Sequence, residues 1–237
     1  MASNASAGAA PGLTNASGFD RGAAVTRSLL GYGVLAGPFY LAVGLVQAFV
    51  RDGFSFSRHP LSVLANGPGG WVQTANFVIT GLMVIAAAVG VARVLAPASR
   101  VTSWWLGAFG TSMIAAAAFR ADPMDGFPVG TPLGPPTTMS ATGMTHFIVG
   151  TLGFTALGVS CLVAARVMSR RGSQSLARLS FASGVVVLVA FFGGGAFANK
   201  SGGILGIWIS VVAGWAWLAT MSLHLYRAAP DPNCAPR

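Results

Sequence analysis

Charged residues are scarce in this chain of 237 residues. They make up 8% of the sequence, whereas about 25% is usual for a soluble domain. Only five are acidic, and none of these is Glu. A chain so poor in charge cannot cover a surface that faces water, and its hydrophobic content of 54% indicates the bilayer as its solvent. The composition therefore excludes an ordinary soluble domain, and the length suits one membrane domain.

Neither a structural disulfide nor a nucleic-acid partner is expected. The only two cysteines, Cys161 and Cys234, fall in an apolar run and in the C-terminal tail, so a structural disulfide is not expected. The net charge of +9 raises the question of nucleic acid. However, the basic residues are scattered between apolar runs and form no patch or basic helix face, so no nucleic-acid partner is predicted.

Six apolar runs are long enough to cross the bilayer, for which a helix needs about 20 residues. They predict an all-α bundle of six transmembrane helices. The spans are Ser28–Val50, Trp71–Leu95, Ser103–Ala121, Thr142–Ala165, Leu179–Ala198 and Ile204–Tyr226. The fifth is the least regular, because three glycines, 193–195, lie in its second half. We expect it to persist, since unpaired backbone groups in lipid cost more than the weak helix propensity of glycine.

The charges between the spans predict the orientation. Ten Lys and Arg residues flank the spans on the side of the two termini, and four lie on the other side. The basic side should be cytoplasmic, so both termini are expected in the cytoplasm, with the plasma membrane as the location. Residues 1–27 lack the basic start and apolar core of a secretory signal and are predicted to be a disordered tail. Residues 28–226 then form the membrane domain, and residues 227–237 form the C-terminal tail.

The two long connections, residues 51–70 and 122–140, both lie on the predicted outer side and hold most of the rare polar residues. A short helix is expected in the first, with Ser57 as its cap and Leu64 near its end. Four acid or histidine residues can reach one outer vestibule and are candidate catalytic residues: His59, Asp122, Asp125 and His146. Four neighbours are candidate substrate-binding residues: Arg58, Gln73, Asn76 and Arg120. Gln73 and Asn76 are three apart, so they share a helix face and should point inward.

Three runs of sequence carry a family resemblance: HPLSVLANGPGGWVQTANF, FRADPMDGFPVGTP and MTHFIVGTLGF. They resemble the bacterial and archaeal membrane family catalogued as domain of unknown function 998, over about residues 28–226. The resemblance implies six helices in a bundle like that of the DRAM and Frag-type proteins. It implies no established activity, so it bears on topology rather than on chemistry. The polar motif residues that match are His59, Pro60, Ser62, Gly70, Trp71, Gln73, Asn76, Asp122, Pro123, Gly126, Pro128 and His146.

Several chemical interpretations stay open for the polar residues. His59, Asp122 and His146 could hold one divalent metal, such as zinc, that activates water. Alternatively, Asp122 or Asp125 could do acid–base work on a lipid or isoprenoid-like molecule without a metal. A third reading is structural, with Arg120 and Asp122 as an ion pair. A proton-coupled carrier is disfavoured because no acidic residue lies in the middle of a span.

The leading hypothesis is an outward-facing polar site that binds or modifies a lipid or small amphiphile. The alternative is a non-enzymatic membrane protein, such as a structural protein, sensor or small-solute facilitator, in which the polar residues tie the outer loops together. The sequence indicates neither an oligomeric state nor a substrate.

Overall fold

The computed structural model describes residues 19–96, 100–134, 138–197 and 202–233. Within these residues the chain forms six α-helices and one short 3₁₀ helix, and it has no β-strand beyond an isolated bridge between Met124 and Phe127. The all-α, six-helix fold predicted from the sequence is confirmed. In chain order the elements are α1 (Arg21–Val50), η1 (Leu61–Ala65), α2 (Gly70–Leu95), α3 (Arg100–Ala118), α4 (Ala141–Arg170), α5 (Gln174–Ala196) and α6 (Gly203–Ala228).

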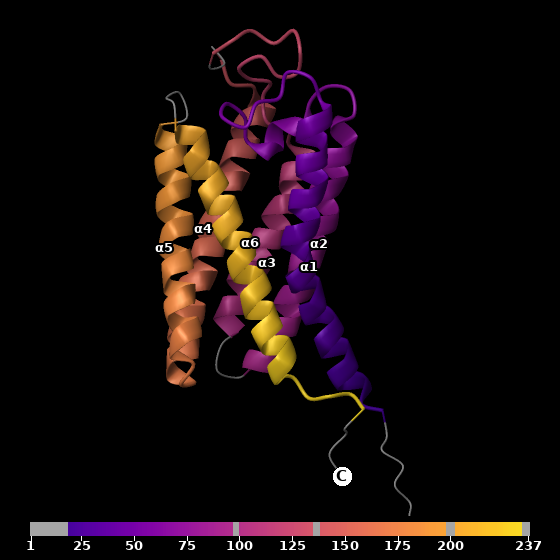
Figure 1. Cartoon of the computed structure of the whole chain (residues 1–237), viewed down its shortest axis with the longest axis vertical. Helices are drawn as coiled ribbons and strands as arrows, with labels where there is room; N and C mark the ends of the chain where they lie inside the picture. Colours follow the sequence, from indigo (N-terminus) through magenta and orange to yellow (C-terminus); the bar gives the residue numbers. More distant parts are fainter. Residues whose placement is uncertain (1–18, 97–99, 135–137, 198–201, 234–237) are drawn as a thin grey trace, which may run out of the picture.

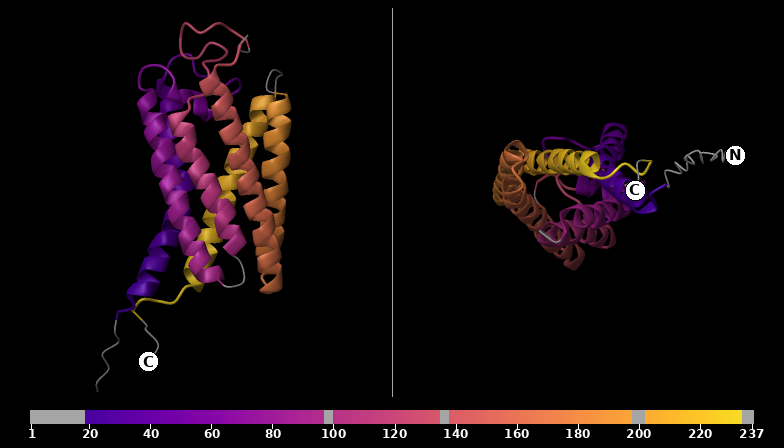
Figure 2. Two further views of the ribbon diagram at one scale, coloured as in Figure 1. Left: turned by 180° about the vertical axis from the view of Figure 1, so that it is seen from behind. Right: turned by 90° about the horizontal axis from the view of Figure 1, so that it is seen from below.

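The helices form a closed ring in chain order (Figures 1 and 2). Each helix packs against the next one, and α6 returns to pack against α1. Contacts across the ring are slight and involve α6 with α2 and α4.

Glycines set the closest approaches between neighbouring helices. A Cβ atom added to Gly81 of α2 would lie 2.7 Å from the carbonyl oxygen of Gly110 in α3. A Cβ added to Gly194 of α5 would lie 2.6 Å from the carbonyl oxygen of Gly203 in α6. Small residues of this kind let membrane helices pack backbone to backbone. Gly194 therefore explains part of the glycine run in the fifth span, and α5 does continue through it to Ala196.

The surface of the ring suits lipid. Large apolar side chains face outward on several helices, for example Phe49, Leu152 and Val189, with 76%, 64% and 68% of their surface exposed. By length and composition, α1, α2, α4, α5 and α6 can each cross a membrane. Of the six helices, α3 alone is not among these five. Its 19 residues still span about 28 Å. It runs back from the end of α2 toward the cap, where the start of α4 lies (Figure 1). The chain is thus built as a multi-pass membrane protein.

Some helix boundaries differ from those predicted. The first helix begins at Arg21, not Ser28, because the Asp20 side chain accepts a hydrogen bond from the backbone N–H of Ala23 and caps it. Residues 21–27 are therefore helical, whereas residues 1–18 of the predicted tail lie outside the described part of the chain. The helix expected from Ser57 is the shorter η1, which follows Pro60 and has no side-chain cap.

Two connections gather at one end of the ring (Figure 1). Residues 51–69, which include η1, and residues 119–140, described except for 135–137, together form what we call the cap. The described ends of the chain meet at the opposite end. There the backbone N–H of Asp20 donates to the carbonyl of Pro232 at 2.8 Å, and Arg27 pairs with Asp231 at 3.5 Å. The two described ends of the chain, near Asp20 and Pro232, thus lie on one side of the ring, away from the cap.

Candidate functional site

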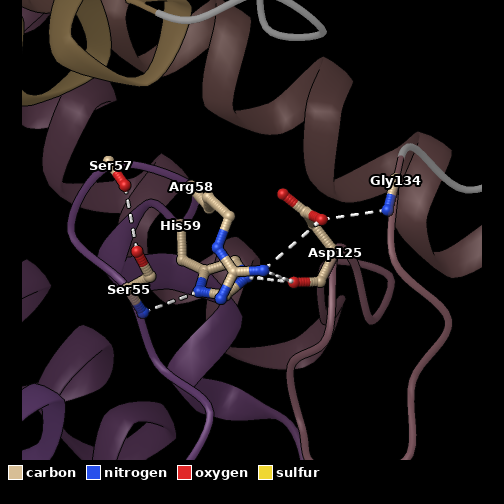
Figure 3. A network of polar contacts seen from close by, with 6 residues as sticks. All are labelled: Ser55, Ser57, Arg58, His59, Asp125 and Gly134. Atoms are coloured by element: carbon tan, nitrogen blue, oxygen red, sulfur yellow. Dashed lines mark hydrogen bonds and ion pairs between the residues drawn. The ribbon is translucent and has the colours of Figure 1, made fainter.

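His59 joins the two halves of the cap (Figure 3). It is fully buried, and its Nδ1 accepts a hydrogen bond from the backbone N–H of Ser55 at 2.9 Å. Its Nε2 lies 3.0 Å from the carbonyl oxygen of Asp125. A carbonyl can only accept, so Nε2 carries the proton and the ring is the neutral tautomer. Burial lowers the pKa of His59 from its ordinary value, which agrees with a neutral ring at pH 7.

Asp125 is the matching residue in the second half of the cap. Its carboxylate accepts a hydrogen bond from the backbone N–H of Gly134 at 2.9 Å and lies 3.7 Å from the Arg58 guanidinium. Arg58 also donates to the Asp125 carbonyl, as His59 does (Figure 3). Asp125 has a φ of 46°, a left-handed conformation that Asp tolerates better than most residues. These contacts hold the loops together, as the structural interpretation expects.

Arg51 is a cap residue that the sequence analysis missed. Its guanidinium donates to the carbonyl oxygens of Leu64 and Asn66 and lies over the ring of buried Phe127, 4.8 Å from the centroid. The Asn66 side chain in turn donates to the carbonyl of Ala121 at 2.9 Å. The available signal was an arginine directly after an apolar span, but its charge served only to predict the orientation in the membrane.

Asp122 makes different contacts from Asp125. Its two carboxylate oxygens accept hydrogen bonds from the backbone N–H and the hydroxyl of Ser140. The Ser140 hydroxyl accepts in turn from the backbone N–H of Gly143 at 2.9 Å and caps α4. Asp122 therefore fixes the start of α4. It forms no ion pair with Arg120, which is exposed and has no ion-pair partner among the described residues.

His146 lies on α4, one turn beyond that cap. Its Nδ1 lies 2.7 Å from the carbonyl oxygen of Phe119, so Nδ1 carries the proton. The neutral ring then keeps an acceptor lone pair on Nε2, and no described residue donates to it. Asp122 is near enough to interact electrostatically with this ring. Of the four candidate catalytic residues, His59 thus contacts Asp125, whereas Asp122 and His146 share the lining of the cavity.

Gln73 and Asn76 point inward from α2, as predicted, and both are buried. Gln47 of α1 donates to the Gln73 carbonyl group at 2.9 Å, and Asn76 donates to the backbone carbonyl of Tyr40 at 3.1 Å. Thr80 donates to Asn76. The network ties α1 to α2. Gln47 and Tyr40 were missed because a single polar residue in an apolar run has no second polar residue whose spacing would indicate a shared helix face.

A cavity of about 290 Å³ lies inside the ring beneath the cap. All six helices line it, mostly with apolar and aromatic side chains such as Phe77, Phe109, Met113, Phe154 and Phe191. Its polar lining residues are Tyr40, Ser62, Ser112, Asp122, His146 and Trp208, and no Lys or Arg is among the described lining residues. The indole Nε1 of Trp208 is buried without a hydrogen-bond partner. The lining thus includes, on α4, a histidine whose Nε2 accepts from no described residue.

The residues proposed as zinc ligands do not fit that role. Within the described residues, no group of three or more His, Cys, Asp or Glu side chains is arranged to hold a metal ion. Both ring nitrogens of His59 are already engaged by backbone groups, so neither lone pair is free for a metal. In addition, His59 does not line the cavity, whereas Asp122 and His146 do.

Comparison with known proteins gives a family but no activity. No curated protein matches the chain. No solved structure matches it either. A family model matches residues 34–224, which runs from α1 through α6 and includes the cap, the cavity and the four candidate catalytic residues. The chain belongs to the family described as proteins of unknown function (DUF998).

Proposed function

We propose that the protein binds an uncharged, single-chain amphiphile in the cavity beneath the cap. The observation that carries this proposal is an apolar lining with few polar groups, among them His146, whose Nε2 accepts from no described residue. Ligand sites are typically apolar pockets with a few placed polar groups. At about 290 Å³, the cavity lies at the lower end of the usual range of about 300–1,000 Å³. It suits one short chain, not a two-chain lipid.

The polar groups favour a hydroxyl as the head of the ligand. A hydroxyl can donate to the Nε2 of His146. An ammonium would lose its hydration in a mostly apolar lining, where the one described carboxylate, Asp122, already accepts hydrogen bonds from Ser140. A phosphate would meet that carboxylate without any cation in the described lining. A medium-chain or isoprenoid-like alcohol is therefore the ligand class that the site favours.

Binding, rather than chemical modification, follows from what the candidate catalytic residues already do. His59 and Asp125 hold the cap together, and Asp122 holds Ser140. His146 is the remaining candidate, and general acid–base catalysis usually needs a group matched to a second partner or nucleophile.

Thermal unfolding of the protein in nanodiscs tests the proposal, with decan-1-ol, decylamine and decyl phosphate as probes. Decan-1-ol should raise Tm, because a ligand at ten times its Kd stabilises the folded state by about 1.4 kcal/mol. The amine and the phosphate should stabilise it less. Equal stabilisation by all three would point to nonspecific partitioning and contradict the proposal.

Gly150 offers a clean way to fill the cavity. It lines the cavity, and a Cβ added there would meet nothing within 4 Å. Gly150→Phe should abolish the effect of decan-1-ol. Gly31→Phe is the matched control, since Gly31 is also a helical glycine with open space but lies outside the cavity.

We further infer that the cap faces outward from the plasma membrane and that both termini are cytoplasmic. The excess of Arg at the end opposite the cap supports this orientation. In whole cells, a membrane-impermeant maleimide should label Ser57→Cys, an exposed cap position, and should leave Cys234 unlabelled until the cells are lysed. The reverse pattern would invert the topology.

A further inference from the structure

A second site lies on the outside of the ring. A groove of about 870 Å³ runs over α3, between α2 and α4. Its floor is formed by small residues of α3, including Gly107, Ala108 and Thr111, and its walls include Val89 of α2 and Leu152 of α4. Because both walls carry exposed apolar side chains, the groove opens toward the lipid and not toward water.

One end of this groove is polar. Arg100 begins α3, is exposed and lines the groove. One turn further on, Ser103 also lines it, with 8% of its surface exposed and its hydroxyl buried without a hydrogen-bond partner. Trp104 and Trp105 flank this end, as aromatic residues do at the level of lipid headgroups.

We propose that this groove binds an anionic phospholipid, with its headgroup at Arg100 and one acyl chain along α3. Charge complementarity selects the headgroup: Arg100 supplies a cation, the start of α3 adds the positive end of a helix dipole, and Arg93 in the last turn of α2 is a second exposed cation at the same end.

The length of the groove agrees with an acyl chain. From Arg100 to Ala115 the lining residues of α3 cover about 22 Å along the helix axis. Half of the hydrocarbon core is about 15 Å thick, so one chain of the leaflet at that end fits along the floor. This site is separate from the cavity beneath the cap, and it does not depend on the ligand proposed there.

Native mass spectrometry of the delipidated full chain tests the proposal, with phosphatidylglycerol and phosphatidylcholine of identical chains as probes. The protein should bind phosphatidylglycerol more tightly. Arg100→Gln should weaken that binding about fivefold, the effect of about 1 kcal/mol per basic residue, and should leave phosphatidylcholine binding unchanged. Arg178→Gln is the matched control, because Arg178 is an exposed arginine of α5 at the same end but away from the groove.

Filling the groove gives an independent readout. Ala108→Phe should reduce the binding of both lipids by displacing the chain, whereas Ala182→Phe, at an exposed position of α5, should not. Equal affinity for the two lipids would overturn the proposal, as would equal losses from Arg100→Gln and Arg178→Gln. A change in oligomeric state on Ala108→Phe, with lipid binding intact, would instead assign the groove to a second copy of the chain.

Discussion

Replacing His59 by Phe should loosen the cap while leaving the six helices in place. The change keeps an aromatic ring beside Phe54 and Phe127, which lie 5.4 and 5.6 Å from the His59 ring, centroid to centroid. It removes the hydrogen bonds to the Ser55 N–H and the Asp125 carbonyl. Each backbone group left unpaired costs about 1–3 kcal/mol. Because both bonds are only part-buried, we expect a total of about 2–4 kcal/mol against the closed cap.

Limited trypsin digestion in detergent measures this opening, because Arg51 and Arg58 provide cleavage sites in the cap. When opening is fast relative to cleavage, the rate follows the population of the open form. A loss of about 2–4 kcal/mol then raises cleavage roughly 30- to 700-fold. His224→Phe is the control, since His224 is exposed near the end of α6, far from the cap. Unchanged cleavage in His59→Phe would refute the role given to His59.

The pH dependence of the same assay follows from the protonation state of His59. Burial lowers its pKa below the ordinary value of 6.5, so the open cap binds more protons than the closed one. The closed cap is therefore fully stable above about pH 6.5 and loses stability as the pH falls toward the lowered pKa. Cleavage of the wild type should rise with acidification over that window. His59→Phe should remove this rise.

Two further predictions concern the packing of the helices. Ser140→Ala and Asp122→Asn should each lower stability by about 1 kcal/mol by weakening the cap of α4, and the double variant should lose less than the sum in thermal unfolding, because the two side chains form one unit. Gly81→Val should prevent α2 from packing on Gly110 and abolish monodisperse protein in size-exclusion chromatography. The corresponding change at Gly31, which has open space, should be tolerated.

The helices could be predicted because each leaves a strong one-dimensional signal. Long apolar runs indicate the spans, and the spacing of Gln73 and Asn76 predicts one inward face, since an unpaired amide in lipid is costly. The start of α1 was misplaced because Asp20 and Arg21 are polar, and hydropathy says nothing of a side-chain cap. Hydropathy thus locates a span more accurately than it locates the end of a helix.

The arrangement of the site could be predicted only in part. The gathering of polar residues at one end was visible, but their pairing was not. His59 binds backbone groups of Ser55 and Asp125, and backbone partners leave no trace in residue type. Likewise, Asp122 accepts its hydrogen bonds from Ser140, which is eighteen residues away in the sequence. The place of His146 in the lining is recognisable only once the cavity between the helices is known.

Photoaffinity labelling with a diazirine derivative of decan-1-ol, mapped by tandem mass spectrometry, tests the cavity most directly. Phe154 lines the cavity, whereas Leu152, on the same helix, is 64% exposed on the outer surface. Labelling should concentrate at Phe154 and its cavity neighbours and should disappear in Gly150→Phe but not in Gly31→Phe. Labelling that favours Leu152, or that survives Gly150→Phe, would contradict a ligand site beneath the cap.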